Sequence, residues 1–249
     1  MVGNLSNAWA LLALPDHALF DSDTLPAKLQ QMGLIDHGSV ADDAAGEVWT
    51  CRFGALPFRL TTGIAAQSFL GDAASPAQSA EIARVIVIDA SVGSACDAVD
   101  LAQQLCAVAA LLAEIWGATS LYWSPARLWS PTSLLAEAVA AIELQSLPPV
   151  LHIVAFDKSE AADGQWTLST RGLGWMVGHE MTLNCPSAYS HSDGLRRATR
   201  LAIDAMVHRG LIGPMTVRGP AERETLVIGP AEVGEPFPRV TVDCRPAPS

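Results

Sequence analysis

The segment from Gln165 to Cys185 places the strongest constraint on the fold. It has three glycines within seven positions, at 172, 174 and 178, and these lie between two stretches of strand-like composition. Trp166–Thr170 has the first strand pattern, and His179–Cys185 alternates apolar and polar residues as a half-buried strand does. A strand, a glycine-rich turn and a second strand are therefore predicted, and a helix pattern follows them.

The rest of the chain predicts an α+β fold with mostly antiparallel sheet and single long helices, because strands pair with strands and helices arrive singly. Ser94–Asp97 is predicted to open a helix that runs to Trp116 and stops at Gly117. Asp36–Gly46 is predicted to be a loop and Val150–Phe156 a strand. The residues predicted to be nearly fully buried are Val85, Val87, Leu105, Val108, Leu112, Val154, Leu183, Leu201 and Met206.

The domain organisation is predicted to be two similar α+β lobes that share one compact unit. Residues 1–147 form the N-terminal lobe, residues 148–235 the C-terminal lobe and residues 236–249 a proline-rich tail with one edge strand. Pro148-Pro149 marks the boundary, since two prolines end the preceding helix pattern.

The net charge limits the classes of partner that the chain can bind. The chain carries a formal charge of −11, which argues against binding nucleic acid or an anionic membrane surface and favours a basic protein partner. No lysine or arginine precedes Lys28, so a signal peptide is not predicted. We expect a soluble, cytoplasmic protein without a cofactor, and the oligomeric state stays open.

Cysteine spacing predicts neither a disulfide framework nor a metal site. The chain has five cysteines without a close pair in sequence, so reduced and mostly buried thiols are expected. The five are Cys51, Cys96, Cys106, Cys185 and Cys244.

The motifs nearest to catalytic signatures have simpler structural interpretations. Gly172–Gly178 lacks the spacing of a dinucleotide loop, and a strand pattern follows it where a helix is required to hold phosphate. His179-Glu180 lacks the second histidine of a zinc protease motif, and strand alternation would place the two side chains on opposite faces. We expect Glu180 to be solvated and Glu180→Gln to be nearly silent. No catalytic constellation emerges.

Aromatic residues gather between Trp116 and Trp129. Next to Arg127 they predict a patch that binds a partner, while packing in the core explains them equally well. The candidate binding residues are Trp123, Arg127, Trp129, Arg171, Trp175, His179 and Glu180, and no catalytic or metal-binding residue is predicted.

Several short segments resemble a bacterial protein family known as domain of unknown function 4261. They are Ala118–Trp123, Val150–Phe156, Thr170–Leu173, Gly178–Glu180 and the helix end His208–Gly210, whereas Leu211–Met215 departs from the acidic, glycine-rich family pattern. The resemblance implies a bacterial, cytoplasmic protein and supplies no activity or catalytic residue.

These observations favour a non-enzymatic binding module for a protein partner, one that is basic in character. The alternative is a small-molecule enzyme that uses Glu180 or Asp89 in a pocket between the lobes.

Overall fold

The computed structural model describes residues 7–15, 25–42, 46–54, 56–65, 82–91, 97–145, 148–160, 164–211, 213–222, 224–234 and 236–245. The chain divides into two compact units, residues 2–149 and residues 150–249. Each unit combines helices with a mostly antiparallel sheet, so the predicted α+β class is confirmed.

The N-terminal unit contains a seven-stranded sheet in which every neighbouring pair is antiparallel. Its strand order is β2-β3-β4-β5-β1-β6-β7. The strands are β1 (Asn7–Pro15), β2 (Ile35–Asp42), β3 (Gly46–Phe53), β4 (Leu56–Ala65), β5 (Ile82–Ser91), β6 (Ser120–Trp123) and β7 (Leu128–Pro131). The loop predicted over Asp36–Gly46 is wrong, because β2 pairs there with β3 and extends the sheet at one edge.

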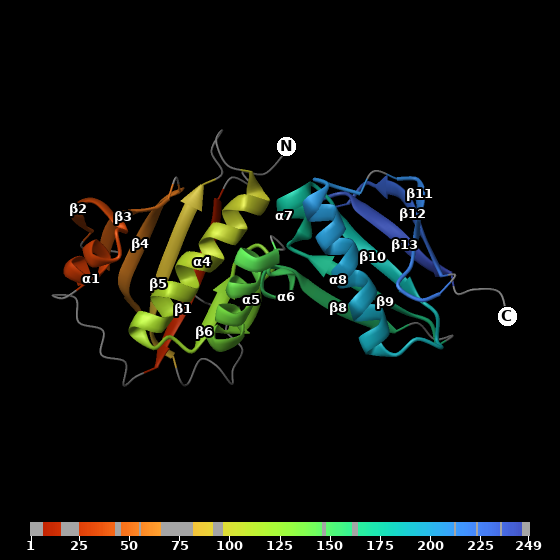
Figure 1. Ribbon diagram of the computed structural model, residues 1–249, viewed down its shortest axis with the longest axis horizontal. Helices are drawn as coiled ribbons and strands as arrows, with labels where there is room; N and C mark the ends of the chain where they lie inside the picture. The colour runs from red at the N-terminus through yellow and green to blue at the C-terminus, as the bar shows by residue number, and fades with distance from the viewer. Residues whose placement is uncertain are drawn as a thin grey trace. The chain divides into compact units, whose positions relative to one another are not determined.

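One long helix, α4 (Ala98–Trp116), runs across one face of this sheet (Figure 1). Asp97 caps its first turn by accepting hydrogen bonds from the amides of Val99 and Asp100, at 3.0 and 2.9 Å. The cap is therefore Asp97 rather than the predicted box that begins at Ser94. Gly117 ends the helix with φ of 65°, a conformation that favours glycine. Among the described residues of this unit, the other helices are α1 (Leu25–Gln31) and α5 (Thr132–Gln145).

The C-terminal unit contains a six-stranded sheet ordered β11-β12-β13-β10-β9-β8. Helix α8 (His191–Val207) lies across one face of it (Figure 1), and a capping box between Ser190 and Asp193 opens this helix. The strands are β8 (Ala155–Glu160), β9 (Trp166–Arg171), β10 (Glu180–Cys185), β11 (Met215–Arg218), β12 (Thr225–Glu232) and β13 (Arg239–Arg245), and the short helices are α6 (Val150–Ile153) and α7 (Leu173–Val177).

Two predictions for this unit are wrong. Val150–Phe156 is not one strand, because α6 precedes β8. Residues 236–249 are not a tail with an edge strand, because β13 lies inside the sheet and pairs in parallel with β10 and antiparallel with β12. The parallel partner of β13 is β10, which lies far away in the sequence, so no turn motif joins the two strands. The proline-rich composition alone therefore suggested an edge strand.

The predicted core is confirmed at the positions where side chains are described. Leu105, Val108, Leu112, Val154, Leu183, Leu201 and Met206 are all buried. The side chains of Val85 and Val87 lie outside the described residues. The predicted glycine-rich turn contains a short helix, α7, that the sequence did not predict. Gly172 and Gly178 flank this helix with φ of 94° and 83°, a conformation that favours glycine. A Cβ at Gly174 would overlap the ring of Phe237, which explains the need for a close backbone approach there.

Leu112→Ala tests the packing of α4 on its sheet. The side chain is fully buried, so we expect the free energy of unfolding to fall by about 2–5 kcal/mol in denaturant melts. Leu111→Ala is the matched control on the same helix, and its half-exposed side chain should give about half that loss or less. Equal losses for the two variants would contradict the observed orientation of α4.

Candidate functional site

A groove between α4 and α5 has a volume of about 650 Å³. Its walls are mostly apolar, and Glu114, Thr132 and Ser133 contribute its polar side chains. The apolar lining consists chiefly of Ala107, Ala110, Leu111 and Ala113 from α4 and Ala136, Val139 and Ala140 from α5. Size and lining are typical of a cleft that takes an apolar ligand or side chains of a partner.

The groove exists because α5 covers little of α4. Among the α5 side chains whose burial is described, Leu135 and Thr132 are buried, while Ala136 and Ala140 are exposed. Thr132 fixes the start of α5, since its hydroxyl donates to the carbonyl of Ala118 at 2.6 Å. Small side chains on the facing surfaces of both helices then leave an open channel.

The two helices that form the groove carry charge of one sign. By sequence, α4 and α5 contain Asp100, Glu114, Glu137 and Glu143 and neither lysine nor arginine. Glu114 lines the groove itself, and the side chains of Glu114 and Glu137 are exposed. An apolar channel with an acidic surround is electrostatically suited to a basic partner.

Helix α4 is also the one helix among the described residues that is long and apolar enough to cross a membrane. Half of that apolar window is buried within the protein. A core helix of a soluble protein passes the same test of length and composition, so this property carries no conclusion about location.

The predicted binding residues fall into two groups, one in each unit. In the N-terminal unit, Trp123 is fully buried and Trp129 is half-buried, with its ring centroid 5.0 Å from that of Tyr122. Arg127 is exposed in the turn between β6 and β7 and has φ of 47°. Burial of Trp123 leaves Arg127 and Trp129 as the members of this group that reach solvent.

In the C-terminal unit, the predicted binding residues lie on and around α7. Trp175 is on this helix, Arg171 precedes it, and His179 and Glu180 follow it. Arg171 forms an exposed ion pair with Asp157 at 3.3 Å, and Trp175 is half-buried on the helix itself. Exposed ion pairs of this kind contribute little to stability. The two buried members of the group, Glu180 and His179, are therefore the informative ones.

Glu180 is buried, which corrects the expectation of a solvated carboxylate. Its two oxygens accept hydrogen bonds from the Thr170 hydroxyl at 2.6 Å and from the Gly172 amide at 2.8 Å. The alternation argument was wrong because β10 begins only at Glu180, so His179 precedes the strand and is buried as well. Both carboxylate oxygens hold the turn between β9 and α7, which is a structural role.

His179 is held as a neutral imidazole. Its Nε2 accepts a hydrogen bond from the amide of Leu211 at 2.9 Å, so the proton lies on Nδ1, which has no hydrogen-bond partner. Burial lowers the pKa of His179, and the nearby Glu180 opposes this only in part. The ring ties the end of α8 to the start of β10.

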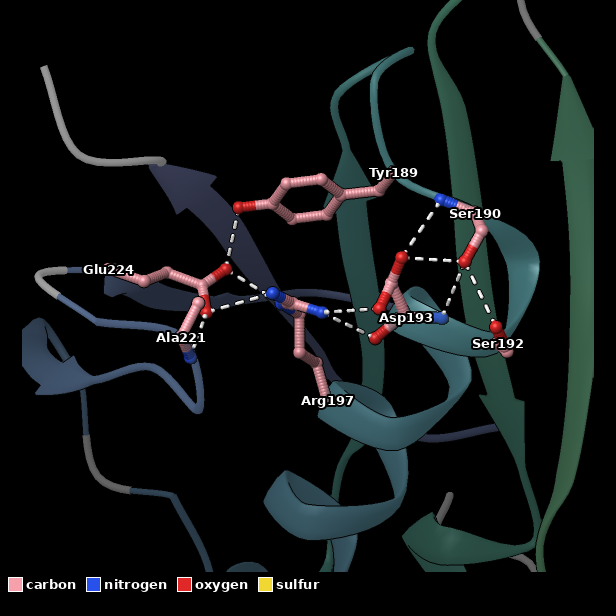
Figure 2. A network of polar contacts seen from close by, with 7 residues as sticks. All are labelled: Tyr189, Ser190, Ser192, Asp193, Arg197, Ala221 and Glu224. Carbon is pink, nitrogen blue, oxygen red and sulfur yellow. Dashed lines mark hydrogen bonds and ion pairs between the residues drawn. The ribbon is translucent and has the colours of Figure 1, made fainter. Parts of the chain in front are cut away.

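A second buried polar cluster joins α8 to the segment before β12, and Figure 2 shows it. Arg197 donates to the two carboxylate oxygens of Glu224 from Nε and Nη2, at 2.6 and 3.0 Å. The Tyr189 hydroxyl and the Ala221 amide donate to the same carboxylate at 2.7 and 3.1 Å. Arg197 and Glu224 are 5% and 1% exposed. Sequence analysis did not find this cluster, because its members are far apart in sequence and belong to no motif.

The pKa values of the cluster follow from its geometry. Burial raises the pKa of Glu224, but hydrogen bonds from Arg197, Tyr189 and the Ala221 amide outweigh it, so the carboxyl titrates below its usual range. Burial and the bond to Glu224 raise the pKa of Tyr189 to about 12. The Arg197 and Glu224 charges are matched inside the cluster.

Among the described residues there is no group of three or more His, Cys, Asp or Glu side chains that could hold a metal ion. Comparisons with known proteins add nothing to this picture: no family model, no curated protein and no solved structure matches the chain. The resemblance stated from the short sequence segments therefore stays a prediction.

Glu180→Gln is expected to lower the free energy of unfolding by about 1–2 kcal/mol, because the glutamine oxygen can replace only one of the two accepting carboxylate oxygens and its NH2 group faces a donor at the other. Glu222→Gln, which changes an exposed carboxylate of the same unit, is the control and should stay within about 0.5 kcal/mol of the parent. A silent Glu180→Gln variant would contradict the role assigned to this carboxylate.

His179 predicts a pH dependence of stability. In the unfolded chain the imidazole titrates near 6.5, whereas the folded pKa is lower. Below pH 6.5 the unfolded chain therefore binds more protons, and the free energy of unfolding falls as the pH is lowered from 7 to 5. His179→Gln should reduce this slope and His208→Gln, at an exposed histidine, should not. His152, whose pKa burial also lowers, accounts for part of the remaining slope.

Proposed function

We propose that this chain is a non-enzymatic binding module whose α4–α5 groove takes the apolar face of an amphipathic, basic helix from a partner protein. The observation that carries the proposal is an apolar channel formed by two helices that contain acidic residues and no basic ones. Grooves between helices commonly bind partner helices through apolar anchors at one-turn spacing.

The spacing of the lining residues supports a helical occupant of the groove. Its lining residues on α5 recur at three- and four-residue intervals, at 133, 136, 139 and 140, so they form a continuous stripe along the helix. Alanines on both walls allow a partner backbone to approach closely, and Phe53, Leu111 and Val139 add larger apolar side chains to the lining. An exposed apolar surface of this kind on a folded protein commonly marks an interaction site.

The charge distribution selects the chemistry of the partner. Glu114 lines the groove from α4, and Glu137 is exposed on α5, the helix that forms the other wall. Lysine or arginine residues that flank the apolar stripe of a partner helix would therefore meet opposite charge. The formal charge of −11 on the whole chain adds long-range attraction for a basic protein. The same charge opposes binding to an anionic lipid surface.

The alternative, a small-molecule enzyme that uses a carboxylate, has less support. Both oxygens of Glu180 are engaged by Thr170 and Gly172, and Glu224 is fully occupied by its partners. The side chain of Asp89 lies outside the described residues. Among the described carboxylates, the buried ones hold the fold rather than face a substrate.

A designed peptide tests the proposal directly. A fluorescein-labelled amphipathic helix of about 14 leucine and lysine residues should bind the full chain with a Kd on the order of 10 µM. Higher salt should weaken binding, because the attraction is partly between exposed charges. The matched peptide with glutamate in place of lysine should not bind.

Two arginine substitutions on α5 locate the site. Ala140→Arg places a long cation inside the groove and should weaken binding by at least about tenfold. Leu134→Arg puts the same residue at an exposed position of α5 outside the groove lining, and should change the Kd by less than about twofold.

Either of two results would overturn the proposal. If Ala140→Arg binds the leucine–lysine peptide with unchanged affinity, the binding surface lies outside the groove. Binding to neutral phosphatidylcholine vesicles that Ala140→Arg abolishes, without peptide binding, would identify a lipid bilayer as the occupant.

A further inference from the structure

Two cysteines that are far apart in sequence become neighbours in the C-terminal unit. Strands β10 and β13 pair in parallel with Asn184 opposite Asp243, so the next residues, Cys185 and Cys244, continue the same register at the ends of the two strands. Both are free, both are buried, and their thiols are hydrogen-bonded to each other. Direct neighbours in a sheet have the Cα separation that a disulfide requires.

A polar pocket of about 270 Å³ reaches this pair. Cys185 and Cys244 line it together with Gln165, Asn184, Ser187 and Asp243. Asn184 and Asp243 are fixed by a hydrogen bond of 2.7 Å between their side chains. The pocket therefore lies beside the pair, while each cysteine is itself less than a tenth exposed.

The opposite side of the pair is covered by α8. A Cβ at Gly194 would lie 3.1 Å from the sulfur of Cys185 and would overlap the ring of Trp166. Glycine at this position allows the helix backbone to pack closely against the Cys185 thiol.

The two thiols are chemically different. The hydrogen bond from the Cys244 thiol lowers the pKa of Cys185, burial opposes this shift, and the guanidinium of Arg197 adds to it. The same hydrogen bond and burial raise the pKa of Cys244, which therefore stays a thiol. The thiolate is the reactive form of a cysteine, and the guanidinium of Arg197, on the helix that covers Cys185, favours that form at Cys185.

We propose that Cys185 and Cys244 form a peroxide-sensitive pair that closes into a reversible disulfide. The Cys185 thiolate attacks hydrogen peroxide, an S–O bond forms, the O–O bond breaks, and the released hydroxide takes a proton from solvent to become water. Cys244 then attacks the sulfenic sulfur, an S–S bond forms, the S–O bond breaks, and the leaving hydroxide takes the Cys244 proton. Two thiols are oxidised by two electrons and one peroxide is reduced to two waters.

The other described cysteines lack this arrangement. Cys51 and Cys106 are buried in the N-terminal unit, and burial raises the pKa of each to about 12. The disulfide would join β10 to β13 and enclose α8, β11 and β12 within one covalent loop. This site is independent of the α4–α5 groove.

The experiment uses the full chain with Cys96→Ser, because Cys96 lies outside the described residues. Four cysteines then remain. On titration with hydrogen peroxide, we expect two thiols to be lost, the intact mass to fall by two hydrogens, and peptide mapping to find Cys185 joined to Cys244. A thiol reductant should restore both thiols.

Variants separate the two roles. Cys244→Ser should leave a sulfenic acid at Cys185 that dimedone traps, and Cys106→Ser should change the oxidation rate by less than about twofold. Glutathione disulfide should oxidise the pair at least about tenfold more slowly than peroxide, because both cysteines are buried and the larger oxidant has less access to them.

The proposal fails if all four thiols survive a peroxide concentration that oxidises an exposed cysteine, or if the disulfide maps to another pair. Mapping on the Cys96→Ser chain decides this even if Cys244→Ser does not fold.

Discussion

The packing of the N-terminal unit depends on how helix α4, which is apolar on nearly every side, is covered by the rest of the unit. From Leu105 to Ala113, α4 contains no polar residue, and a helix of that kind requires cover all around it. The seven-stranded sheet covers one face, which buries Leu105, Val108 and Leu112. Helix α5 covers only part of the rest, so the remaining surface becomes the wall of a groove. The candidate site thus follows from the same packing that stabilises the fold.

The C-terminal unit is organised by buried polar groups that satisfy one another. Arg197 and Glu224 form a two-point ion pair, which would leave an uncompensated buried charge if either partner were removed. Glu180 closes the turn before α7, and His179 joins the end of α8 to the start of β10. Because these groups are committed to structure, they offer little to a substrate. The exceptions are the two thiols at the ends of β10 and β13, which a pocket reaches.

Sequence patterns predicted the features that are local. The stop of α4 at Gly117 and the positive φ of Gly178 follow from residue type and neighbours, and apolar periodicity identified most of the described core. Features set by distant pairing were missed. The inner position of β13 and the adjacency of Cys185 to Cys244 both require strands to meet across long stretches of chain. The burial of Glu180 was missed because its strand begins one residue later than predicted. The groove was missed for a different reason: alanines on α4 and α5 predict helix equally well whether they are covered or open. The absence of basic residues from both helices was the available signal.

The proposed function requires that the surface between α4 and α5 is the binding face. Amide chemical shifts of the full chain, measured by NMR with and without the leucine–lysine helix, test it most directly. We predict that the largest shifts lie at Ala107, Ala110, Ala136 and Ala140, with little change in β10 and β13. Shifts concentrated around Arg127 and Trp129, or around α7, would contradict the claim and return the binding site to the residues that the sequence alone had suggested.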